Sequence, residues 1–73
     1  MKAKTDIEVI NFLINDGRFI EGVKVTYLEI SADLKDSIDK KLIQDIENLT
    51  DKDYYFCSNN KKLVIPRLKK ADE

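Results

Sequence analysis

The sequence predicts a small α+β domain of three helices and one antiparallel β-hairpin. Apolar residues recur at helical spacing near the N-terminus and again over residues 37–49. Two β-rich runs flank Asn59 and Asn60, a pair that tolerates positive φ in a tight turn. With 73 residues, the chain is near the lower limit for a core without staples, so we expect one domain over residues 1–73. Its tail should fray from about residue 69.

Composition excludes several kinds of functional site. The chain has no His, which removes imidazole bases, His metal sites and His-based triads. Its two glycines lack a phosphate-loop pattern, and its carboxylates lack the spacing of a calcium loop. We therefore expect no enzyme, no metal and no cofactor.

Cysteine usage and hydropathy indicate the compartment. Cys57 is the only cysteine, so an internal disulfide is ruled out, and a lone Cys between aromatic residues in a strand is typically a small buried side chain. A reactive thiol would need a cationic or helix-terminal setting, which the sequence does not show. No apolar run reaches membrane-spanning length, and no signal-peptide core is present. An intracellular protein, cytoplasmic or nuclear, is expected.

The first expected helix begins at a cap on Thr5 or Asp6, with Glu8 in its first turn. Gly17 should end it as a left-handed C-cap. One face carries the apolar residues Ile7, Ile10, Leu13 and Ile14.

Val9 and Phe12 widen that apolar face to roughly 220°, which is broader than one buried stripe requires. Two interpretations are open. Both side chains belong to the core of a very small domain, or they form a dimer or partner surface.

Residues 18–24 are expected to be a short extended segment, and two interpretations compete for the next stretch. As a helix, it is capped by Thr26, with Glu29 completing a Thr-x-x-Glu capping box, and it ends near Lys35. As a strand, residues 23–30 are rich in β-branched and aromatic residues. We favour the helix. The strand would give the order helix, hairpin, helix, hairpin in an α+β sheet domain.

The third expected helix is capped by Asp36 or Ser37 and is the clearest element in the chain. Its apolar stripe, with Ile43 at the border, consists of Ile38, Leu42, Ile46 and Leu49. In the hairpin that follows, Pro66 suits an edge strand or the end of a strand.

This order of elements resembles the winged helix-turn-helix superfamily. The segment "IEVINFLINDGRFI" is similar to its first helix and short strand, and "VTYLEISADL" to its Thr-capped second helix. "SIDKKLIQDIENL" resembles the recognition helix, and "DYYFCSNNKKLVIP" resembles the wing. The link "KDS" departs from the pattern because it lacks the usual glycine. The resemblance implies duplex DNA binding, with the third helix in the major groove and the wing on the backbone, although many members bind proteins instead.

Polar residues of the third helix and the hairpin turn have the chemistry for a duplex. Lysines suit phosphates or guanine, the amides of Gln44 and Asn48 suit adenine, and Ser37 with the first helix amides suits a phosphate. Such residues also occur on any solvated helix face. The candidate DNA-binding residues are Ser37, Lys40, Lys41, Gln44, Asn48, Asn59, Asn60, Lys61 and Lys62.

Charge balance argues against strong duplex binding. The formal net charge is −1, whereas a dedicated DNA-binding domain usually has a basic footprint. Positive charge gathers in residues 54–73, which carry five basic and two acidic groups. We expect a DNA-binding regulator of transcription or replication that is weak as a monomer and acts as a homodimer. The alternative is a protein-interaction module that docks on a larger complex.

Overall fold

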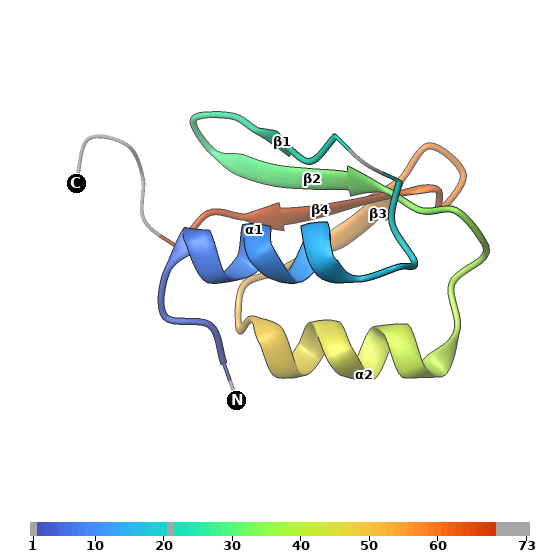
Figure 1. Ribbon diagram of the computed structural model, residues 1–73, viewed down its shortest axis with the longest axis horizontal. Coiled ribbons are helices and arrows are strands. Elements are labelled where there is room, and N and C mark those ends of the chain that lie inside the picture. The colour runs from blue at the N-terminus through green and yellow to red at the C-terminus, as the bar shows by residue number, and fades with distance from the viewer. Residues whose placement is uncertain (1, 21, 69–73) are drawn as a thin grey trace.

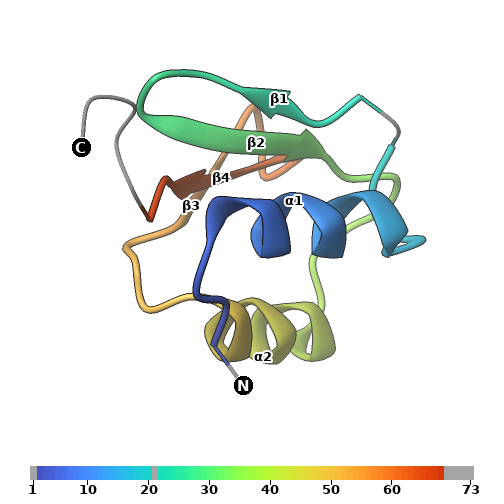
Figure 2. The ribbon, with the colours of Figure 1, turned by 60° about the vertical axis from the view of Figure 1, so that its left-hand side comes forward.

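Two helices cover one face of a four-stranded antiparallel sheet in the computed structural model, which describes residues 2–20 and 22–68 (Figure 1, Figure 2). The strand order in the sheet is β1-β2-β4-β3, so β1 and β3 are its edges. In chain order the elements are α1 (Asp6–Asn15), β1 (Lys24–Val25), β2 (Glu29–Asp33), α2 (Lys40–Leu49), β3 (Tyr55–Cys57) and β4 (Lys62–Pro66). The expected frayed tail lies outside the described residues.

The prediction of a winged helix-turn-helix is wrong, because the described chain holds two helices and no second helix of that motif. The stretch expected to be a helix from Thr26 to Lys35 instead contains a tight turn and strand β2. The observed order is helix, hairpin, helix, hairpin, which is the alternative that the β-rich composition of residues 23–30 allowed.

The hydrogen bonds of Thr26 explain why its capping-box pattern wrongly predicted a helix. Its Oγ1 accepts hydrogen bonds from the N–H groups of Leu28 (3.3 Å) and Glu29 (3.1 Å), and its own N–H donates to Glu29 O at 2.8 Å. A threonine hydroxyl makes such local bonds equally well at a helix N-terminus and in a turn. All of β2 pairs with β4, from Glu29 opposite Pro66 to Asp33 opposite Lys62. This pairing favours the turn over the helix.

The β3–β4 hairpin is confirmed, but it is not a peripheral wing. Ser58, Asn59 and Asn60 have φ of 56°, 59° and 63°, as the Asn-Asn turn required. Strand β4 pairs with β2 on its other side and is therefore central. Pro66 occupies the end of β4, the second of the two positions expected for it.

Helix α1 begins as expected and ends differently. Thr5 is its N-cap, and Glu8 completes the capping box with the N–H of Thr5. The expectation for Gly17 is wrong, because the C-cap is Asp16 in an extended conformation and Gly17 does not have positive φ. The carboxylate of Asp16 accepts from the N–H of Arg18 at 2.9 Å. This hydrogen bond stabilises the end of the helix without a residue in the left-handed conformation.

The buried side of α1 is centred elsewhere than on the expected face. Val9 and Leu13 are 0% and 1% exposed, whereas Ile7 and Ile14 are 67% and 62% exposed. The assignment of Val9 to a partner surface is therefore wrong, and Phe12 is half-buried against the core. Because the apolar arc of α1 is broad, more than one part of it can pack against the sheet. In this structure the part around Val9 does so.

Helix α2 begins later than expected. Its N-cap is Asp39, whose carboxylate accepts from the N–H of Leu42 at 2.8 Å, so the expected cap at Asp36 or Ser37 is wrong. The apolar stripe is confirmed for Leu42, Ile46 and Leu49, which are buried, while Ile38 precedes the helix.

The core lies between the two helices and the near face of the sheet. Strand positions facing the helices are Ile30, Ala32, Leu63 and Ile65, all buried. Because side chains alternate along a strand, the neighbouring positions such as Ser31 point to the opposite face, which no described element covers (Figure 1). No helix within residues 2–20 and 22–68 is long and apolar enough to cross a membrane.

Candidate binding surfaces

The exposed side of α2 carries four of the residues expected to contact DNA. Lys40, Lys41, Gln44 and Asn48 are all exposed, opposite the buried stripe of the helix. The structure therefore brings these four together. Ser37 lies in the loop before the helix and is separated from the first turn by the Asp39 cap, so it does not join the helix amides in one phosphate site.

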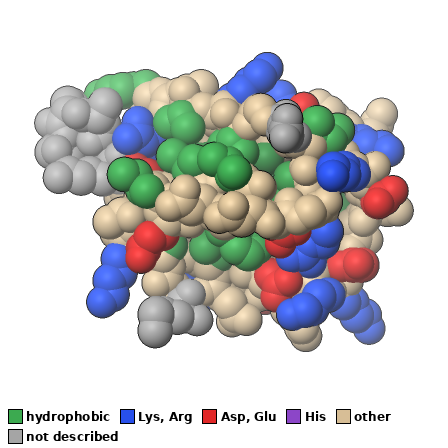
Figure 3. Space-filling model, in the orientation of Figure 1, with side chains coloured by type: hydrophobic (Ala, Val, Ile, Leu, Met, Phe, Trp, Pro, Cys, Tyr) green, Lys and Arg blue, Asp and Glu red, His purple; other side chains and the backbone are tan. Residues whose placement is uncertain are grey.

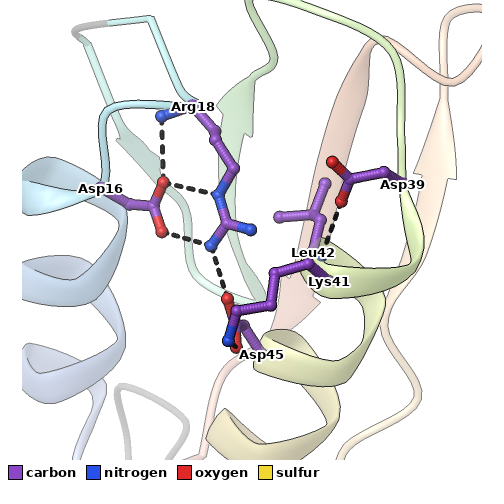
Figure 4. A network of polar contacts seen from close by, with 6 residues as sticks. All are labelled: Asp16, Arg18, Asp39, Lys41, Leu42 and Asp45. Atoms are coloured by element: carbon purple, nitrogen blue, oxygen red, sulfur yellow. Dashed lines mark hydrogen bonds and ion pairs between the residues drawn. The ribbon is translucent and has the colours of Figure 1, made fainter.

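An ion-pair network uses part of the charge on this helix (Figure 4). Asp45 accepts from Lys41 Nζ at 2.9 Å and from Arg18 Nη2 at 2.8 Å. The guanidinium of Arg18 also binds Asp16, with Nη2 at 2.6 Å and Nε at 2.9 Å. The network joins the end of α1 to the outer side of α2. A phosphate approaching Lys41 would therefore meet the carboxylate of Asp45.

The network shifts the pKa values of its members in the directions expected for charge pairing. Hydrogen bonds from the Arg18 side chain lower the pKa of Asp16, although burial opposes the shift. Lys41 first, and Arg18 second, lower the pKa of Asp45. The hydrogen bond to Asp16 raises the pKa of Arg18, with a smaller contribution from Asp45. All three groups stay charged near neutral pH, as a structural clamp requires.

The turn between β3 and β4 holds the other residues expected to contact DNA. Asn59, Asn60 and Lys61 are exposed, and Lys62 is half-buried in β4 opposite Asp33. This turn belongs to the sheet, whereas the exposed side of α2 points away from the sheet (Figure 1, Figure 2). The two parts of the expected DNA site therefore lie on different layers of the molecule and do not form one continuous face.

A different surface gathers most of the exposed apolar side chains of the described residues. It consists of α1 and the neighbouring β1–β2 hairpin, and we call it the apolar surface. Figure 3 shows hydrophobic side chains clustered between these elements. Its members, each about half to two-thirds exposed, are Ile7, Ile14, Ile20, Val25, Tyr27 and Leu28.

Two observations show that these side chains adjoin. A pocket of about 370 Å³ is lined by Ile14 and Ile20 together with Ile10, Gly22 and Val23, so the end of α1 and the segment before β1 share one hollow. At the other end, Arg67 binds both the carboxylate of Asp6 (Nε–Oδ2 3.1 Å) and the carbonyl of Thr26 (3.2 Å). This contact holds the tip of the β1–β2 hairpin beside the first turn of α1.

The pattern that points to this surface is visible in the sequence. The apolar arc of α1 is broader than one buried stripe needs, and Ile7, Ile10 and Ile14 recur at positions i, i+3 and i+7. Sequence reasoning left open whether Val9 and Phe12 belonged to the core or formed a partner surface. Only the position of the sheet shows that the exposed part is Ile7 and Ile14.

Comparison with protein-family models, with curated proteins and with solved structures finds no match to this chain. Among the described residues, no cluster of three carboxylate or thiol side chains could hold a metal ion. The candidate function therefore rests on the surfaces themselves.

Proposed function

We propose that this chain is a small protein-interaction module that binds through the apolar surface. The observation that carries the proposal is the exposure of Ile7 and Ile14 on α1, where Ile14 also lines a pocket shared with the segment before β1. Exposed apolar clusters of this kind mark protein contacts in soluble proteins, because water contact with them is unfavourable. The polar surroundings, with Glu8 and Asn11 exposed on α1, fit the rim of such an interface.

Duplex DNA binding receives less support from the geometry. The residues expected to contact DNA are divided between two layers, and Lys41 is paired with Asp45. Near α2, Asp39, Asp45 and Glu47 would repel phosphates. DNA binding stays a prediction that a titration of labelled duplex at two salt concentrations would test.

The experiment that tests the proposal compares capture of binding partners by three forms of the protein. Ile14→Asp places a charge in the apolar surface, and Asn48→Asp places the same charge on the exposed side of α2. Both positions are exposed, so both variants should keep the far-UV spectrum of the wild type. We expect Ile14→Asp to lose the proteins that wild type and Asn48→Asp both retain.

Equal capture by all three forms, including equal capture of an untagged copy of the protein itself, would contradict the proposal. Salt-sensitive duplex binding that is weakened by the double substitution Lys61→Ala and Lys62→Ala would support the DNA-binding alternative instead.

A further inference from the structure

Within residues 2–20 and 22–68, no strand pairs with the outer edge of β1, which borders the apolar surface and presents backbone groups to it. Thr26 N–H donates to Glu29 O at 2.8 Å, and pairs in an antiparallel ladder alternate between hydrogen-bonded and non-hydrogen-bonded. The next pair, Val25 opposite Ile30, is therefore a non-hydrogen-bonded pair. The N–H and C=O of Val25 point away from β2, toward the open edge of the sheet.

Such an edge accepts another strand, and its register is limited by side-chain direction. Val25 lies on the helix side of the sheet, as does its partner Ile30, whereas Lys24 lies on the open side. Within the two residues of β1, a second β1 strand can therefore be centred either on Val25 opposite Val25 or on Lys24 opposite Lys24. Two lysines directly opposite each other repel, so charge favours the register centred on Val25.

We propose that the apolar surface joins two copies of this chain, through antiparallel pairing of their β1 strands about a two-fold axis at Val25. The proposal rests on the proposed function and names the partner of the same surface. A two-fold axis perpendicular to the sheet keeps both helical layers on one side. This arrangement places the exposed isoleucines of both α1 helices near the contact between the two β1 strands.

This register also pairs the residues on either side of Val25. Lys24 lies opposite Thr26 of the second copy, where the turn of the β1–β2 hairpin begins. The exposed turn residues Tyr27 and Leu28 of each copy then lie near the segment before β1 of the other copy, where Val23 lines the pocket. Contacts of this reciprocal kind are what a two-fold interface requires.

Area and charge also fit a second copy. The exposed side chains of the apolar surface amount to roughly a few hundred Å², less than the about 800 Å² per partner that a stable interface buries. Pairing of the two β1 strands adds the edge of the sheet to the buried surface. The net charge of −1 gives two copies almost no long-range repulsion.

Sedimentation equilibrium of wild type and charge variants of Val25 tests the proposal. The side chain is 47% exposed, so Val25→Glu and Val25→Lys should both fold, which circular dichroism checks. In the dimer each variant sets two like charges opposite each other. We expect each alone to raise the dimer Kd about tenfold or more. An equimolar mixture of the two variants should restore the dimer, because residue 25 then meets its opposite charge across the axis.

Tyr55→Lys is the matched control for Val25→Lys, since Tyr55 is also 47% exposed but lies on β3, at the other edge of the sheet, where a lysine can pair with Glu29, the present partner of the Tyr55 hydroxyl. It should leave the dimer Kd unchanged. A wild type that stays monomeric up to millimolar concentration would overturn the dimer. So would a dimer that tolerates both Val25 variants, or variants whose mixture is no tighter than either alone.

The partner-capture comparison separates the two proposals. A monomeric wild type whose protein capture is still lost in Ile14→Asp would overturn the dimer and leave the proposed function standing. A monomeric wild type whose capture does not depend on Ile14 would overturn both.

Discussion

Gly22 is the residue at which backbone conformation constrains this sequence most directly. Its φ is +102°, a value that side-chain-bearing residues rarely adopt, and it lies in the segment that leads into β1. Space does not limit this position, because a Cβ added here would meet no atom within 4 Å. Any penalty for a side chain at residue 22 therefore comes from the backbone alone.

Gly17 offers a matched comparison for this effect. A Cβ there also has open space, but its φ is not positive. We expect Gly22→Ala to lower the free energy of unfolding by about 1 kcal/mol or more, and Gly17→Ala to leave it unchanged or slightly raised. Urea denaturation of both variants checks this. Equal effects of the two substitutions would contradict the backbone explanation.

At the scale of single elements, short hydrogen-bonded motifs decide where helices and hairpins begin. The capping box at Thr5 and Glu8 fixes the start of α1, and Asp39 fixes the start of α2. Thr26 has the same sequence signature as Thr5, with Glu three residues later, yet it closes a β-turn. The threonine hydroxyl accepts from the N–H three residues later at both Thr5 and Thr26, so a capping signal indicates a chain reversal or a helix start, but not which of the two.

The hydroxyl of Thr26 should therefore contribute to the stability of the β1–β2 hairpin. We expect Thr26→Ala to lower the free energy of unfolding by about 1 kcal/mol, because the N–H groups of Leu28 and Glu29 lose their acceptor. Thr26→Ser keeps an oxygen at the same position and should lose less. Thermal denaturation measures both variants, and a Thr26→Ser protein as unstable as Thr26→Ala would rule out this role of the hydroxyl.

At the scale of the whole molecule, two groups of ion pairs and hydrogen bonds, here called clamps, connect elements outside the apolar core. The carboxylate of Asp6 binds Arg67 and the N–H of Leu68, which connects the start of α1 to the end of β4. Arg18, with Asp16 and Asp45, connects the end of α1 to α2 (Figure 4). Each clamp bridges segments that are distant in the sequence or belong to different elements.

The Arg18 clamp predicts a loss of stability in acid. The folded-state pKa of Asp16 is lowered below the ordinary value of 3.8, so its contribution is complete above that value. The contribution is lost as the pH falls from about 4 toward the lowered pKa. We expect Asp16→Asn to reduce the slope of unfolding free energy against pH in this acid range. Denaturation curves at several pH values measure the slope.

Arg18→Gln serves as the second variant, because it removes the partner and leaves the carboxylate in place. It should also flatten the acid slope. Wild-type slopes in both variants would show that the clamp does not control acid stability.

The sequence by itself determined those features of this protein that depend on neighbouring residues. The sequence indicated the start of α1 at Thr5 or Asp6, the apolar stripe of α2 and the turn at Asn59 and Asn60, because each follows from a capping side chain, from helical spacing or from tolerance of positive φ. It also indicated that the apolar arc of α1 exceeds the needs of one buried stripe.

Only the tertiary structure decided the state of residues 26–35 and the position of the apolar surface. Strand β2 exists because β4, about thirty residues later in the chain, supplies its hydrogen-bond partners, and no local pattern encodes that pairing. The position of the same sheet determines which part of the apolar arc of α1 is buried, so Val9 is buried while Ile7 and Ile14 are exposed. In both cases the local sequence is compatible with two arrangements, and contacts between distant segments selected one of them.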